Sequence, residues 1–185
     1  MNKFLFTNFL FLLFISCHVD SEECCDNQIP EVAFQELGYD KPYIYNNTYF
    51  GRNKYIEFHP GSLPIIISAP HGGNLIPSEI PDRTYGTMVT DSNTKELTLA
   101  IKNAFLSKIG KTPYVIINNL KRTKFDANRD SIEGAQGNIY ARRAWEEFHY
   151  YINESKKMIQ QDFNYGLFLD IHGHGGNPDG FYDLR

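Results

Sequence analysis

The chain has 185 residues, of which 42% are hydrophobic and 22% charged, and its formal net charge is -4. This composition is typical of one globular domain with a sizeable core, and it excludes a disordered or collagen-like chain. The sequence has no long run of Lys or Arg that would form a basic surface for binding nucleic acids or anionic membranes. We therefore expect a small-molecule or peptide partner recognised by a local site, and no nucleic acid.

Residues 1–17 have the features of a targeting segment. Lys3 precedes an apolar run from Phe4 to Ile15 that is too short to span a bilayer comfortably. We interpret residues 1–17 as a secretory signal peptide, with an uncleaved anchor as the alternative. The expected protein is secreted, with no membrane contact after signal cleavage. Residues 18–41 predict a linker, and residues 42–185 predict a single domain.

The cysteines lie only in this N-terminal region, at Cys17, Cys24 and Cys25. Adjacent cysteines rarely pair with each other, so the partners of Cys24 and Cys25 stay open. Because no cysteine lies near the histidine-containing segments described below, we expect neither a thiol nucleophile nor a Cys-rich zinc site.

The first expected elements are a hairpin and a buried strand. Alternating aromatic residues over 41–58, interrupted at 51–53, predict a hairpin with tyrosines on one face. The Ile-rich run over 63–69 shows no polar alternation, which is typical of a strand covered on both faces in a largely parallel sheet. This strand is followed at once by Pro-His-Gly-Gly, residues 70–73.

Two helices and two further strands are expected after it. Apolar spacing predicts a helix over 91–110 and a longer one over 138–162, with short apolar strands at 114–117 and 167–171. The buried stripe of the longer helix should consist of Ala141, Trp145, Phe148, Ile152, Ile159 and Phe163. This order predicts an α/β fold, with a mostly parallel or mixed sheet and helical crossovers.

Two histidines stand at equivalent places in this pattern. His71 and His172 each follow an apolar strand and each precede glycine. A neutral imidazole is a good zinc ligand, and glycine lets the backbone turn sharply and leaves space for a metal and a substrate. Either histidine alone could be structural. Since parallel strands end at one edge of a sheet, where ligands gather, the pair together predicts a metal site there.

The segment between the histidines has residues suited to an anionic ligand. Arg122 and Arg129 supply guanidinium groups and Asn128 an amide, which favour recognition of a carboxylate by forked hydrogen bonds. The alternative is a solvated loop with an internal pair between Asp126 and Arg129.

These segments together resemble a known enzyme family. A strand followed by PHGG, then TDSNTKEL at 90–97, LKRTKFDANR at 120–129 and LDIHGHG at 169–175 are similar in order and spacing to the N-formylglutamate amidohydrolase family. That family belongs with the zinc carboxypeptidase-like hydrolases. The resemblance covers residues 43–175 and implies a carboxypeptidase-like fold.

The resemblance implies a Zn²⁺ ion held by His71 and His172. A carboxylate usually completes such a site, but Asn74 stands where the carboxypeptidase pattern has glutamate. We favour Asp91 as the third ligand over Glu79. Asp91 could instead be only the N-cap of its helix.

The implied activity is metal-dependent hydrolysis of a C–N amide bond in a small carboxylate-bearing amide or peptide. Arg129 and Asn128 would bind the substrate carboxylate, and Arg122 would support them or stabilise the developing oxyanion. His174 is a candidate for an outer contact, an oxyanion donor or a substitute ligand. These assignments make His174 and Arg122 the candidate catalytic residues.

One element expected from the family is missing. A glutamate general base should follow the second histidine at some distance, yet the sequence ends at Arg185. We therefore expect a fold that is incomplete at its C-terminus, with Glu133 as an unsupported substitute for the base. The alternative is a catalytically inactive metal- or carboxylate-binding protein on the same scaffold. A third reading makes the histidines structural and the chain an interaction domain.

Overall fold

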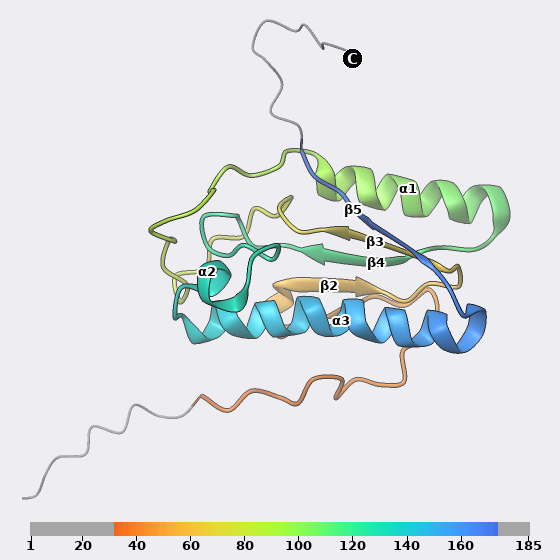
Figure 1. Cartoon of the computed structure of the whole chain (residues 1–185), viewed down its shortest axis with the longest axis horizontal. Coiled ribbons are helices and arrows are strands. Elements are labelled where there is room, and N and C mark those ends of the chain that lie inside the picture. Colours follow the sequence, from red (N-terminus) through yellow and green to blue (C-terminus); the bar gives the residue numbers. More distant parts are fainter. Residues whose placement is uncertain (1–31, 174–185) are drawn as a thin grey trace, which may run out of the picture. The chain divides into compact units, whose positions relative to one another are not determined.

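The computed structural model describes residues 32–173 (Figure 1). The chain forms two compact units, which divide between Phe34 and Gln35. Of the first unit, only residues 32–34 are described, and they form neither helix nor strand. The second unit contains every element below. The expected signal peptide, the three cysteines and His174 lie outside the described residues.

A five-stranded mixed sheet forms the centre of this unit, in the order β1-β2-β4-β3-β5. Its strands are β1 Tyr49–Phe50, β2 Ile56–His59, β3 Ile65–Ala69, β4 Tyr114–Asn118 and β5 Leu167–Asp170. β1, β2 and β4 pair antiparallel, whereas β4, β3 and β5 are parallel. The expected hairpin and mixed α/β sheet are therefore confirmed.

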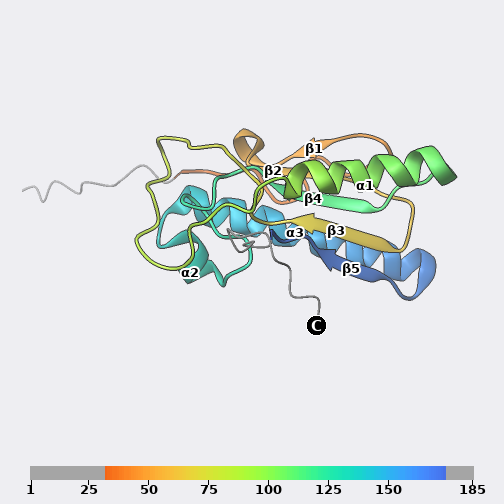
Figure 2. The same cartoon turned by 90° about the horizontal axis from the view of Figure 1, so that it is seen from above.

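Two long helices cover opposite faces of the sheet: α1, Thr94–Ile109, and α3, Ile139–Phe163 (Figures 1 and 2). The chain runs from β3 to its neighbour β4 through α1, and from β4 back across β3 to β5 through α3. Because these crossovers run in opposite directions, connections of the same hand place their helices on opposite faces.

Both faces of β3 and β4 are buried, as the absence of polar alternation predicted. On the α1 face lies a small cluster of Ile67, Ala69, Val115 and Ile117, all fully buried. Alternate residues of the same strands, including Ile66 and Ile116, join a larger cluster against α3. The twofold period of a strand thus divides one apolar run between two cores.

The predicted stripe of α3 is largely correct. Ala141, Phe148, Ile152 and Ile159 are buried, while Trp145 and Phe163 pack at the margin of the same cluster. The Asn138 side chain caps the helix by accepting hydrogen bonds from the amides of the second and third helical residues.

The helix α1 begins later than the sequence predicted, at Thr94. Asn93 occupies the N-cap position in a left-handed conformation and its side chain makes no capping bond. Asp91 therefore lies before the helix and does not cap it. The short helix α2, Ser131–Ala135, was not predicted, since its five residues are too few for an apolar period and include glycine.

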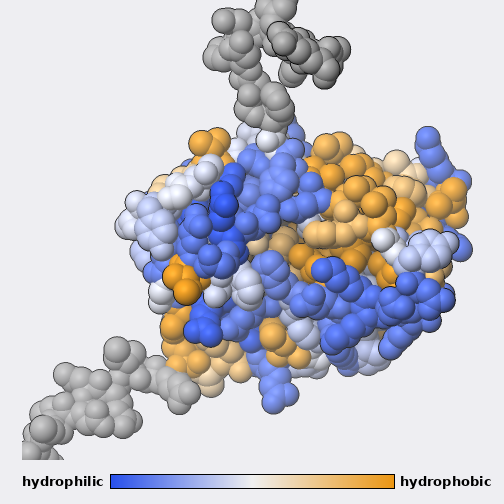
Figure 3. All heavy atoms as spheres, in the orientation of Figure 1, coloured by the Kyte–Doolittle hydropathy of each residue, from blue (hydrophilic) through white to orange (hydrophobic). Residues whose placement is uncertain are grey.

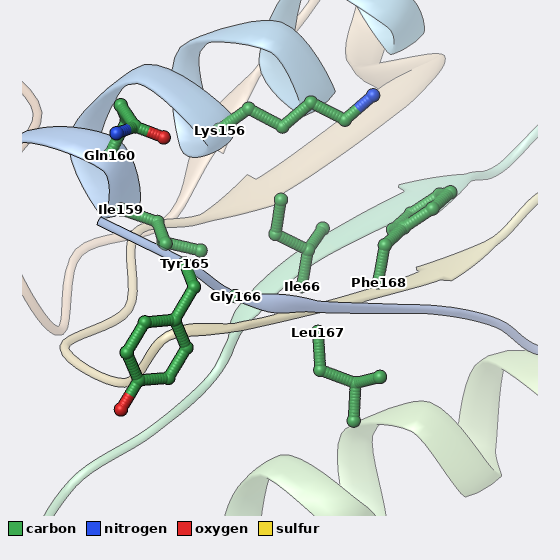
Figure 4. Close-up of a pocket in the computed structure, with 8 residues that line it drawn as sticks. All are labelled: Ile66, Lys156, Ile159, Gln160, Tyr165, Gly166, Leu167 and Phe168. Atoms are coloured by element: carbon green, nitrogen blue, oxygen red, sulfur yellow. The ribbon is translucent and has the colours of Figure 1, made fainter. Parts of the chain in front are cut away.

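At one edge of the sheet, β5 pairs only with β3. Its apolar side chains Leu167, Phe168 and Leu169 are 52%, 44% and 40% exposed. Figure 4 shows Leu167 and Phe168 on opposite faces of the strand, next to a pocket of about 290 Å³. Figure 3 shows an apolar surface in the region of α1 and β5. None of the helices in the described part of the chain is both long and apolar enough to cross a membrane.

Candidate metal centre

The two histidines lie side by side at the carboxyl edge of the sheet. Ser68 of β3 pairs in register with Asp170 of β5, so the residues that follow these strands are neighbours. The ring centroids of His71 and His172 are 5.1 Å apart. β3 leads to α1 on one face and β4 leads to α3 on the other, and ligands commonly bind at such a switch point.

A carboxylate completes the group. Asp91 Oδ2 lies 3.4 Å from His71 Nδ1 and 3.3 Å from His172 Nδ1. All three ligand atoms lie within 4.8 Å of one another. Two ligands at about 2.0–2.1 Å from a tetrahedral zinc ion would be about 3.3 Å apart. His71, Asp91 and His172 therefore form a group that could bind a metal ion.

His71 presents a free nitrogen to this group. Its side chain is 1% exposed, and Nε2 donates to Asp126 Oδ1 at 2.7 Å. Nδ1 is buried and has no hydrogen-bond partner among the described residues. A carboxylate on the far nitrogen fixes the tautomer and orientation of a metal-binding imidazole, so the contact with Asp126 leaves the Nδ1 lone pair available.

His172 repeats this arrangement in a more open position. Its side chain is 38% exposed, and Nε2 lies 3.0 Å from Asp170 Oδ2 while Nδ1 faces Asp91. The next residue, Gly173, donates its backbone N–H to Asp91 Oδ2 at 2.9 Å. A Cβ on Gly173 would lie 2.8 Å from Asp91 Cβ, so glycine is what permits this close approach.

The glycines after His71 have a similar steric explanation. A Cβ on Gly73 would lie 2.2 Å from the backbone carbon of Asn119. Because backbone cannot yield as a flexible side chain can, a larger residue here would push apart the segments that follow β3 and β4. The glycine at position 73 thus lets two site-bearing segments touch.

Sequence reasoning missed the role of Asp126. This carboxylate is completely buried. It accepts hydrogen bonds from Arg122 Nε at 3.0 Å, from the Asn128 backbone N–H at 3.0 Å and from His71 Nε2. Burial would raise the pKa of Asp126, but His71 and Arg122 outweigh burial and hold that pKa well below its ordinary value. An available signal was its place between apolar Phe125 and Ala127 in an otherwise polar segment.

Asp91 is also held in its charged form. Burial would raise the pKa of Asp91, but the Gly173 backbone amide and the neighbouring His71 and Arg122 side chains lower it below its ordinary value. Its backbone N–H donates to the His71 carbonyl at 3.1 Å. Asp91 is therefore tied to the segments after both β3 and β5.

Of the three residues expected to bind a carboxylate, Arg122 and Asn128 contact the candidate metal group, whereas Arg129 pairs with Glu133. Arg122 lies inside the acidic cluster, with Nη1 3.5 Å from Asp91 Oδ1. Asn128 Nδ2 lies 3.2 Å from His172 Nε2. Arg129 is 46% exposed and pairs with Glu133 at 3.5 Å. The alternative pairing of Asp126 with Arg129 is wrong, because Asp126 is occupied by His71 and Arg122.

Glu79, the other carboxylate considered as a ligand, lies in a different cluster. It accepts hydrogen bonds from Arg52, Asn53 and Tyr55. Hydrogen bonds from Arg52 and Tyr55 lower the pKa of Glu79 to about 2. Among the described residues, the group that could bind a metal ion therefore includes Asp91 and not Glu79.

Comparison of the chain with protein-family models, with curated proteins and with solved structures gave no match.

Proposed function

We propose that the chain is a zinc-dependent amidohydrolase that cleaves a C–N amide bond in a small, carboxylate-bearing substrate. The observation that carries this proposal is the convergence of two imidazole nitrogens and a carboxylate oxygen at the carboxyl edge of the sheet, with His71 Nδ1 lacking any hydrogen-bond partner. The resemblance of four ordered segments to N-formylglutamate amidohydrolases supports the reaction class.

The donor set fits zinc. Two imidazoles and one carboxylate are the protein ligands of many catalytic zinc sites, which keep a fourth position open. The partial exposure of His172 gives solvent and substrate a route to the group. Zn²⁺ bound there would polarise the amide carbonyl and lower the pKa of a coordinated water to about 7.

The surrounding residues would orient the ligands and the substrate. Asp126 fixes the His71 ring, and Asp170 contacts the corresponding nitrogen of His172. Arg122 balances the charges of Asp91 and Asp126 and could donate to a developing oxyanion. Arg129, half exposed, supports our assignment of a carboxylate-binding residue because it has the planar fork that such ligands require.

A binding protein without turnover is the second candidate. Its support is the position of Glu133, the candidate general base, which is paired with Arg129. The described part of the chain places no glutamate in the His71, Asp91 and His172 group. Metal binding without hydrolysis would identify this candidate.

The test is metal analysis followed by an activity assay on the full chain. We expect about one equivalent of zinc per chain, lost in His71→Ala and retained in His59→Ala, which removes another buried histidine that lies outside the group. The zinc-loaded protein should hydrolyse N-formyl-L-glutamate and not its diamide. Retained zinc without hydrolysis of carboxylate-bearing amides would favour the binding protein, and absence of zinc would reject both the amidohydrolase and a metal-binding protein.

A further inference from the structure

Arg83 is a buried cation beside the metal-binding group that the proposed chemistry does not use. It is 4% exposed. Its Nη1 donates to the carbonyls of Thr87 at 2.9 Å and Arg122 at 3.1 Å, and lies 3.6 Å from Asp126 Oδ2. Arg83 thereby ties the loop that leads to Asp91 to the segment that carries Asp126.

The other edge of the Arg83 guanidinium group makes no hydrogen bond with the described residues. Nε and Nη2 are both buried, and in the described part of the chain neither has a hydrogen-bond partner. Together these two groups form the side-on fork with which arginine binds a carboxylate through parallel hydrogen bonds. Leaving such donors buried and unpaired is costly. The fork is thus suited to a carboxylate that occupies it in another state of the protein.

The carboxylate of Glu133 lies near this fork. Arg83 Nη2 lies 2.7 Å, and Glu133 Oε1 3.0 Å, from the point where a Cβ on Gly86 would stand. A Cβ at position 86 would crowd both groups, so glycine is what lets them lie this close to one another. Glu133 instead contacts Arg129 Nε at 3.5 Å. One carboxylate therefore has an arginine on each side.

We propose that Glu133 moves from Arg129 to the open fork of Arg83 when Arg129 binds a substrate carboxylate. This inference rests on the proposed function, in which Arg129 receives that carboxylate. A bound carboxylate beside Glu133 would place two negative charges together, which is unfavourable. Transfer of Glu133 to Arg83 removes this repulsion and satisfies the buried donors. Glu133 then acts as an internal competitor that a ligand must displace.

A double-mutant cycle tests this exchange. Binding of N-formyl-L-glutamate to the metal-free full chain, which avoids hydrolysis, is measured by calorimetry. E133Q should tighten binding by about two- to fivefold, since it removes a partly exposed ion pair. R83M should weaken binding about tenfold, because displaced Glu133 loses its charged partner. In the E133Q background, R83M should change binding by less than about twofold.

The controls separate this inference from the proposed function. R129A should abolish the carboxylate-dependent binding, and unchanged binding in R129A would reject both the substrate contact and the exchange. N-formyl-L-glutamine amide, which lacks both carboxylates, should bind equally to wild type and E133Q. Equal weakening by R83M in the wild-type and E133Q backgrounds would overturn the exchange alone, as would weaker binding in E133Q.

Arg83 also braces two loops, so R83M is checked by circular dichroism. If R83M does not fold, R83K replaces it in the cycle, because lysine keeps the charge and lacks the fork. A crystal structure of the wild-type chain with N-formyl-L-glutamate provides an independent reading. We expect Glu133 within hydrogen-bond distance of Arg83 Nη2, and an unchanged pair of Glu133 with Arg129 in the occupied site would overturn the proposal.

Discussion

Two charged clusters in this molecule use the same kinds of residues with different results. In the cluster around Glu79, the carboxylate accepts hydrogen bonds from Arg52, Asn53 and Tyr55. In the cluster around His71, a buried nitrogen is left without a hydrogen-bond partner and faces the carboxylate of Asp91. The difference teaches that the number of charges does not mark the candidate site, whereas an unsatisfied imidazole nitrogen beside a second histidine and a carboxylate does.

Removal of His71 should produce the largest difference between the clusters. His71→Ala deletes the nitrogen that faces the centre, so zinc affinity should fall by more than about 100-fold, beyond the range for outer contacts. Competition with a chromophoric chelator measures this loss. His59→Ala should bind zinc like the wild type, and equal loss in both variants would mean that the effect is not specific to the group.

Asp126→Asn should have the next largest effect. Loss of the buried negative charge removes the group that orients His71 and balances Arg122, and zinc affinity should fall by about 10- to 100-fold. The same chelator competition reports the change. Normal affinity in this variant would show that the contact between Asp126 and His71 has no part in metal binding.

Glu79→Gln should affect folding and leave metal binding unchanged. The substitution weakens charge-assisted hydrogen bonds with Arg52 and Tyr55, so the free energy of unfolding should fall by about 1–2 kcal/mol. Urea denaturation measures this loss. A fall in zinc affinity at unchanged stability would contradict the division into two clusters.

The smallest expected effect is a difference in acid sensitivity. Because the folded-state pKa of Glu79 is lowered to about 2, its contribution to stability is complete above its ordinary pKa, near 4.5, and is lost as the pH falls towards 2. Urea midpoints measured between pH 5 and pH 2.5 should therefore decline less in Glu79→Gln than in the wild type. An equal decline of the urea midpoint in both proteins would show that protonation of Glu79 does not cause the loss of stability.

The sheet, and the meeting of the two histidines at its edge, could be predicted from the sequence because both depend on local patterns. An apolar run without alternation indicates a buried strand, and parallel strands bring their ends together, so His71 and His172 could be expected to meet. Asp91 was favoured as a ligand through the family resemblance, and its own loop has no periodicity to locate it. Contacts made by Arg83 and Arg122 hold that loop in place.

The partners of Asp126, Arg129 and Glu133 could not be predicted in the same way. Charged residues close in sequence suggested a local pair between Asp126 and Arg129, whereas folding buries Asp126 against His71 and leaves Arg129 at the surface. The short helix α2 brings Glu133 to Arg129. The pair of Arg129 with Glu133 has the i,i+4 spacing of a helix, whereas the contact of Asp126 with His71 depends on which distant segments pack together, and sequence spacing does not record that contact.

The most direct test of the central claim is the coordination of zinc in the loaded protein, by X-ray absorption spectroscopy and a crystal structure. We predict one ion bound by Nδ1 of His71, Nδ1 of His172 and an oxygen of Asp91, at about 2.0–2.2 Å each. An ion bound without the two histidines, or a loaded protein in which their rings do not share an ion, would contradict the account.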